Sequence, residues 1–236
     1  RARDLHRTGR SIKQLRFFDF NYIPERPLMR PEVKPVTDAL LRAQLLTEEL
    51  EDRLGPTAKI PARFLLTLNL LDEFGFQPGE GAGGYYRGHP QLAHYPLFES
   101  LLDQLDVGRA EREAFVPSTV ADALHHKLKS AYDDLLTLAV YLAIAERQVV
   151  LFSPRMRQAI LILGMPVRGG YYDFHGTSDE GEWSGADDDH HEDLWFIIQQ
   201  AATPDRYDEV LRRAHYYLGL WSQFWDEQVA GLRAVS

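Results

Sequence analysis

Two carboxylates stand inside apolar helical patterns, where a charge is costly. Glu73 ends the run FLLTLNLLDEF, and Glu146 lies in the middle of LTLAVYLAIAERQVVLF. At helical spacing the neighbours of Glu146 are only Leu, Ala and Val. A carboxylate on such a face needs a cationic partner. Either a metal ion or an arginine could fill that role for Glu146, and the arginine could be Arg147, Arg155 or one more distant in the chain.

Histidines and one more acid have the same unusual placement. His94 begins the apolar helix HYPLFESLLDQL, and His175 follows an aromatic cluster. Asp187 and His190 are three residues apart, which places them on one helical face that continues through Leu194. The pattern predicts either a hydrogen-bonded pair or two metal ligands.

A neighbouring pair offers an alternative, because Asp188 and His191 have the same spacing. We prefer His190, since the residues four and seven positions after it are Leu and Ile, whereas Gln199 lies eight after His191. The remaining acids of the run ADDDHHED suit a solvated helix start.

Carboxylates and imidazoles without thiolates favour iron or manganese over structural zinc. The chain has no cysteine, which also excludes disulfides and a cysteine nucleophile. Helical bundles build dinuclear sites from inward-facing Glu and His. The ferritin-like version requires Glu-x-x-His, and neither Glu73 nor Glu146 has a histidine three residues later.

The elements that must position these residues are helical. Apolar residues recur at helical spacing, and no stretch alternates as a strand would. The predicted helices cover 36–54, 58–74, 91–106, 119–150, a shorter segment capped by Ser153-Pro154, 186–202 and 205–232. Glycine-rich loops occupy 75–88 and 166–185. We expect an all-α bundle of about seven helices in one domain (35–236), preceded by an extended N-terminal arm (1–34).

Composition narrows the function classes. The 236-residue chain carries a net charge of −9, which speaks against nucleic acid and anionic membranes as partners. No apolar run approaches the ~20 residues of a membrane span, so we expect a cytoplasmic protein. The expected partner is a small molecule, and a homodimer and an external electron donor are both compatible with the sequence.

The order of these residues resembles the haem-oxygenase-like di-metal oxidases and oxygenases. Four segments carry the resemblance, which covers about residues 57–230: NLLDEFG, the helix from His94, YLAIAERQVVLF, and YYDFH followed by DDDHHEDLW. Two insertions depart from the family pattern. The first separates Glu73 from His94, and the second places His175 and Asp187 twelve residues apart, where the family has four.

The resemblance implies two Fe(II) ions, or manganese, with O2 as co-substrate. The ligands carried over are Glu73, His94, Glu146, His175, Asp187 and His190. By position, Asp72 and Tyr141 would orient the histidines. The family implies hydrogen abstraction from a small substrate, and we expect a free aliphatic amino acid that is desaturated or cyclised, as in azetidine-forming oxidases of natural-product pathways.

An amino-acid substrate needs a cation for its carboxylate and an acceptor for its ammonium group. Arg87, Arg168 and Tyr85 lie in or beside the two insertions and are the candidate binding residues. Two alternatives stay open: an N-oxygenase or C–C-cleaving enzyme of the same fold, and a non-catalytic helical binding protein.

Overall fold

The computed structural model describes residues 35–77, 87–174 and 186–233, and within these ranges the chain is helical. The predicted all-α class is confirmed, while the N-terminal arm lies outside the described residues. The α-helices are α2 (Pro35–Leu46), α3 (Glu51–Leu54), α4 (Lys59–Glu73), α5 (His94–Gln104), α6 (Arg109–Glu113), α7 (Thr119–Lys129), α8 (Leu135–Ile162), α9 (Tyr171–Phe174), α10 (Ala186–Ala201) and α11 (Tyr207–Arg233). Short 3-10 helices are η1 (Thr47–Leu50), η2 (Pro90–Leu92) and η3 (Pro204–Arg206).

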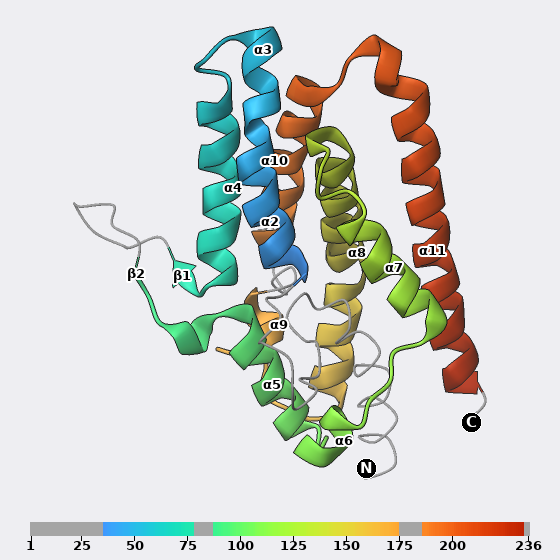
Figure 1. Ribbon diagram of the computed structural model, residues 1–236. Coiled ribbons are helices and arrows are strands. Elements are labelled where there is room, and N and C mark those ends of the chain that lie inside the picture. Colours follow the sequence, from blue (N-terminus) through green and yellow to red (C-terminus); the bar gives the residue numbers. More distant parts are fainter. Residues whose placement is uncertain (1–34, 78–86, 175–185, 234–236) are drawn as a thin grey trace.

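Helix α8 is the centre of the molecule and packs against α2, α7, α9, α10 and α11 (Figure 1). Two apolar cores form along it. The larger core joins α2, α4, α7, α10 and α11 to the first half of α8. The smaller core joins α5 and α9 to Ile160, near the end of α8. The two cores therefore meet part-way along one helix.

The chain from 119 to 162 differs from the sequence prediction in two places. A helix over 119–150 is wrong, because α7 ends at Lys129 and α8 begins after Asp134, whose carboxylate caps α8 by accepting from the backbone N–H of Thr137. The predicted break at Ser153-Pro154 is also wrong, because α8 continues through Pro154 to Ile162. Its buried face continues to Ile160, and this packing outweighs the lost backbone hydrogen bond.

This continuation makes α8 long and apolar enough to cross a membrane by length and composition, contrary to the sequence estimate. Of its most apolar window, 67 % is buried inside the bundle. That burial is what the core helix of a helical bundle requires.

The first glycine-rich insertion is closed at its base by a small antiparallel pair. Strand β1 (Phe76–Gln77) pairs with β2 (Arg87–Gly88), with Phe76 opposite Gly88. The pairing brings the chain back to the end of α4, so α5 starts beside α4 (Figure 1). This hairpin explains how Glu73 and His94 come together despite the 20 residues between them in the sequence.

Gly75 makes the close approach between α4 and the start of α5 sterically feasible. It has φ +80°, and its N–H donates to the Asp72 carbonyl at 2.8 Å. A Cβ at this position would lie 2.4 Å from the Ala93 nitrogen and 2.5 Å from the Leu92 carbonyl carbon. Only glycine therefore leaves room for the backbone that leads into His94.

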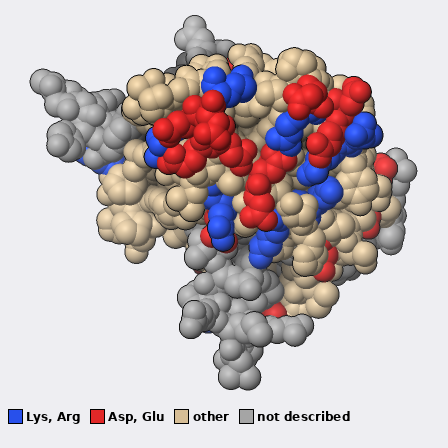
Figure 2. Space-filling view, turned by 45° about the horizontal axis from the view of Figure 1, so that its top comes forward, with Lys and Arg blue, Asp and Glu red and all other residues tan. Residues whose placement is uncertain are grey.

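Both signs of charge occur together on the face that the top of the bundle presents (Figure 2). Lys59 contacts Glu48 at 2.5 Å and Glu51 at 2.6 Å, and Arg63 contacts Glu48 at 2.5 Å. These are surface pairs, each of which contributes little to stability.

Gly75→Ala should destabilise the protein more than Gly55→Ala. Both glycines have positive φ, but an added Cβ at Gly55 meets nothing within 4 Å. Left-handed strain should cost Gly55→Ala about 1 kcal/mol, and the backbone overlap at Gly75 should add about 1–3 kcal/mol. Urea unfolding of the two variants measures the difference; equal losses would contradict the role given to Gly75.

Candidate metal centre

Four helices bring three carboxylates and two imidazoles into one connected cluster. Asp72 and Glu73 come from the end of α4, His94 from the start of α5, Glu146 from α8 and His190 from α10. We call these five residues the carboxylate–histidine cluster. It lies where the two apolar cores meet: Glu146 is flanked by core residues of the larger one, and Leu97, in the smaller one, lies one turn after His94.

The contacts run in a line with Asp72 in the middle. His94 Nδ1 lies 3.1 Å from Glu73 Oε1, and its Nε2 lies 3.4 Å from Asp72 Oδ2. On the other side, His190 Nε2 lies 3.4 Å from the same Asp72 oxygen, and its Nδ1 lies 4.0 Å from Glu146 Oε2. Each imidazole therefore faces two carboxylates, and Asp72 is shared.

The cluster is buried. Relative exposure is 4 % for Glu73, His94 and Glu146 and 5 % for His190. The Asp72 side chain, at 25 %, is the most accessible of the five. Arg147 and Arg155, the alternative partners for Glu146, are both exposed. The Asp72 oxygen that faces the two histidines, Oδ2, is nevertheless buried.

The electrostatics of this interior point favour positive charge. Burial acts to lower the pKa of His94, but the charge of Glu73 and the contacts with Asp72 and Glu73 outweigh it. The net result is a His94 pKa well above its usual value. Buried carboxylates produce this effect because a nearby cation reduces their desolvation cost.

A cross-helix hydrogen bond holds α4 against α10 one turn from the cluster. Asn69 Nδ2 donates to Asp193 Oδ2 at 3.0 Å, and Asn69 is 1 % exposed. Asn69 precedes Glu73 by four residues and Asp193 follows His190 by three, so this bond fixes the two helix faces that carry Glu73 and His190. In the sequence Asn69 is part of the NLLDEFG segment, but its position along the chain does not predict this contact.

The structure separates His190 from its neighbour. His191 is half-buried, and its Nδ1 lies 3.1 Å from the backbone carbonyl of Ala143 on α8. His190, not His191, faces the carboxylates, as the apolar face of the helix had indicated.

Of the six predicted ligands, the structure brings together Glu73, His94, Glu146 and His190. His175 lies outside the described residues, as does the side chain of Asp187, whose backbone belongs to α10. The chain leading to His175 does reach the cluster. In α9, the Tyr171 ring lies edge-on to the His94 ring with centroids 6.4 Å apart.

Two residues predicted to orient the histidines have different positions. Asp72 contacts both His94 and His190 and is the centre of the cluster. Tyr141 instead stacks on Tyr217 of α11, with ring centroids 4.5 Å apart. Its hydroxyl makes no hydrogen bond within the described residues. The consecutive acids in LLDEF marked Asp72 as a candidate. Sequence spacing does not predict that one Asp72 oxygen contacts both histidines.

The arrangement is not that of ligands around an ion. In the described ranges, which leave out His175 and the Asp187 side chain, no group of three or more His, Asp or Glu side chains is placed to hold a metal. Each imidazole nitrogen instead faces a carboxylate oxygen, at the distances given above.

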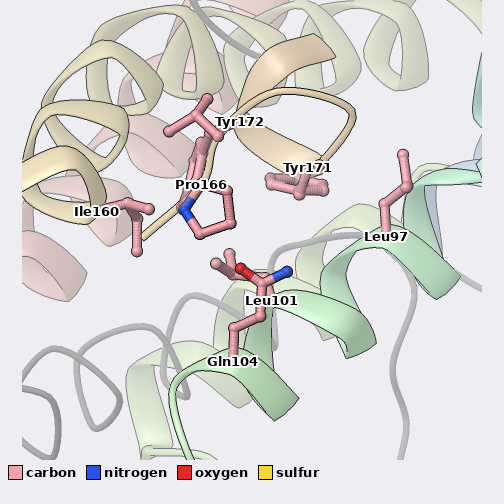
Figure 3. Close-up of a pocket in the computed structure, with 9 residues that line it drawn as sticks. Leu97, Leu101, Gln104, Ile160, Pro166, Tyr171 and Tyr172 are labelled. Atoms are coloured by element: carbon pink, nitrogen blue, oxygen red, sulfur yellow. The ribbon is translucent and has the colours of Figure 1, made fainter. Parts of the chain in front are cut away.

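An apolar hollow begins one turn from His94 (Figure 3). It is shallow, since the space inside it that a water molecule could occupy is only about 10 Å³. Its lining comes from α5, the end of α8, α9 and the loop before α9: Leu97, Leu101, Gln104, Ile160, Pro166, Val167, Gly170, Tyr171 and Tyr172. Tyr171 lines the hollow and also contacts His94.

The predicted substrate-binding residues lie at the surface or outside the description. Arg168 is exposed and directly follows Val167, which lines the hollow. Arg87 is exposed in β2. Tyr85 lies outside the described residues.

Comparison with models of known protein families and with curated proteins gives no match to this chain.

Removing one buried charge should stabilise the metal-free protein. Glu146→Gln keeps the shape of the side chain and removes one of three neighbouring carboxylates. The free energy of unfolding in a chelator at pH 8 should rise by about 1 kcal/mol. The control is Glu192→Gln, an exposed position on α10 that should change by less than ~0.5 kcal/mol. A loss of stability in Glu146→Gln would show that Glu146 is favourably paired rather than repelled.

Proposed function

We propose that this protein is a non-haem di-iron oxidase that uses O2 to remove hydrogen from a small aliphatic substrate. The observation that supports it is the buried line Glu73–His94–Asp72–His190–Glu146, with contacts of 3.1 to 4.0 Å. The six-residue pattern found in the sequence agrees with it, since four of its members belong to this line.

The donor set fits a pair of hard to borderline cations. Oxygen and imidazole ligands without thiolate suit iron and manganese. Buried carboxylates are strongly destabilising unless cations neutralise them. Glu73 with His94 would hold one ion and Glu146 with His190 the other, and His175 and Asp187 are the further ligands that the resemblance implies.

Two Fe(II) ions bound there would supply the electrons that activate O2. Desaturation takes two hydrogen atoms from the substrate, which corresponds to two electrons and two protons. Reduction of O2 to two waters needs four of each, so an external one-electron donor would provide the other two electrons. Without such a donor, the two electrons and two protons taken from the substrate reduce O2 to hydrogen peroxide.

The chain's own residues would bind the substrate and exclude water. The shallow hollow beside His94 is lined mostly by apolar side chains, and it would have to widen to receive an aliphatic chain. Arg168, next to Val167 at its edge, is the cation for a substrate carboxylate. The alternative of a non-catalytic helical binding protein gives no reason to bury three carboxylates and two imidazoles together.

Metal binding tests the site. Anaerobic titration of the purified protein with Fe(II) should give about two equivalents bound, as in other dinuclear sites. Glu146→Ala should lose at least one equivalent, because half of the site loses its carboxylate. Glu192→Ala on the surface of α10 is the matched control and should bind as the parent does. Equal iron in Glu146→Ala and the parent would exclude Glu146 as a ligand.

Turnover with Fe(II), O2 and a reductant tests the reaction. Among free aliphatic amino acids and short fatty acids, a substrate should lose two hydrogens by mass. A gain of oxygen would indicate the N-oxygenase, and a fragment would indicate C–C cleavage.

Arg168→Gln should raise KM about tenfold with little effect on kcat, whereas Arg155→Gln on α8 should change neither. Leu101→Trp should exclude longer chains, and unchanged selectivity would remove the hollow from the proposal.

A further inference from the structure

Helix α11 carries a distinctive row of residues on the side away from the apolar core. It lies at the edge of the bundle and packs against α7 and α8 (Figure 1). Its core-facing side includes Tyr217 and Trp221, which are 2 % and 1 % exposed. Because successive helix residues are turned by about 100°, Gly219 lies on the opposite side. The residues seven positions before and after it, Arg212 and Asp226, share that side and are exposed.

The glycine at the centre of this row is not explained by the fold of one chain. Glycine inside a helix is less favourable than alanine. A Cβ at Gly219 would meet nothing within 4 Å among the described residues, whereas a Cβ at Gly75 would overlap the backbone ahead of His94. A glycine on the outer side of a helix allows the backbone of another molecule to approach closely.

The two charges that flank Gly219 are also left over by the fold. The neighbouring Arg213 pairs with Glu209 of the same helix. Arg212 and Asp226, by contrast, form no ion pair within the described residues. They carry opposite charges and lie at equal distances on either side of Gly219, which makes this face of α11 complementary to itself.

We propose that this face of α11 binds the same face of a second copy of the protein, with the two helices antiparallel and a two-fold axis beside Gly219. Two-fold symmetry of this kind is the most common in protein homo-oligomers. The symmetry places Arg212 of each copy opposite Asp226 of the other. One arginine and one aspartate therefore provide two ion pairs across the contact.

Exposed apolar residues on one flank of the face fit the same symmetry. Leu211, Leu218 and Val229 are 55 %, 40 % and 44 % exposed and lie about 90° around the helix from Gly219. A two-fold axis that reverses the helix direction keeps this flank of both copies on the same side of the pair. Leu218 then meets Leu218 of the second copy, and Leu211 meets Val229, because their positions along the axis agree within about 3 Å. The contact would cover apolar surface that one chain leaves in water.

The proposed contact brings no like charges together, which matters because each chain has a net charge of −9. The other exposed residues of the face meet residues with which they do not clash in charge: Asp208 lies near Ala230, His215 near Ser222 and Tyr216 near Gln223. The face is therefore one on which two acidic molecules can approach each other.

Charge reversal tests the contact in the full chain, kept in a chelator so that metal binding plays no part. Analytical ultracentrifugation of the parent should show a monomer–dimer equilibrium that depends on concentration. Arg212→Glu and Asp226→Arg should each raise the dissociation constant at least tenfold, because each change replaces two attractions by two repulsions. The double variant restores both pairs and should return to within about threefold of the parent. Arg42→Glu, an exposed reversal on α2, is the matched control and should dimerise as the parent does.

A second variant separates the contact from the stability of one chain. Gln is a much better helix former than Gly, but its side chain would hold the two helices apart. At a concentration where the parent is monomeric, Gly219→Gln should raise the thermal midpoint by about 2 °C, while its dissociation constant should rise at least tenfold. A lowered midpoint would show that a single chain needs Gly219, against the inference.

Three results of the charge-reversal experiment would also overturn the inference. A parent that is monomeric at every concentration would leave this face to solvent or to another part of its own chain. A dimer that survives both single reversals would use a different surface. A double variant as weak as the single ones would exclude the pairing of Arg212 with Asp226.

Discussion

Three carboxylates in the interior of a helical bundle are the constraint on which the rest of this structure depends. Charges removed from water are expensive unless opposite charge reaches them. Here the five side chains of the cluster come from four helices, so no single segment can satisfy them. The bundle must therefore hold α4, α5, α8 and α10 in register, and it does so with a buried polar link from Asn69 to Asp193 and with apolar packing along α8.

The cluster lies at the junction of the two apolar cores, and this has a chemical consequence. The larger core fixes Glu146 and His190 from one side. The smaller core continues away from His94 into the hollow beside Tyr171. In the proposed function, these rigid elements would carry the metal ligands, and the apolar space beside them would receive the substrate.

The proposed division of work follows from these positions. The buried glutamates and histidines would hold the ions, and the hollow would receive the aliphatic part of the substrate. The β1–β2 pair between α4 and α5 shows how the bundle accommodates an insertion. The pair returns the chain to the end of α4, and Gly75 lets the backbone ahead of His94 approach that end closely.

The sequence by itself determined the helical class, the apolar faces, and the candidacy of Glu73, His94, Glu146 and His190, because each of these follows from local periodicity. The apolar pattern did not predict the break before Asp134, where the Asp134 carboxylate caps the start of α8. It also did not predict that α8 continues through Pro154, because packing around Ile160 on distant residues stabilises that part of the helix. Apolar spacing favoured His190 over His191, but only the tertiary structure showed that His191 contacts a backbone carbonyl instead and put Asp72 between two histidines. Those choices depend on which atoms of separate helices meet, and spacing along one chain holds no information about that.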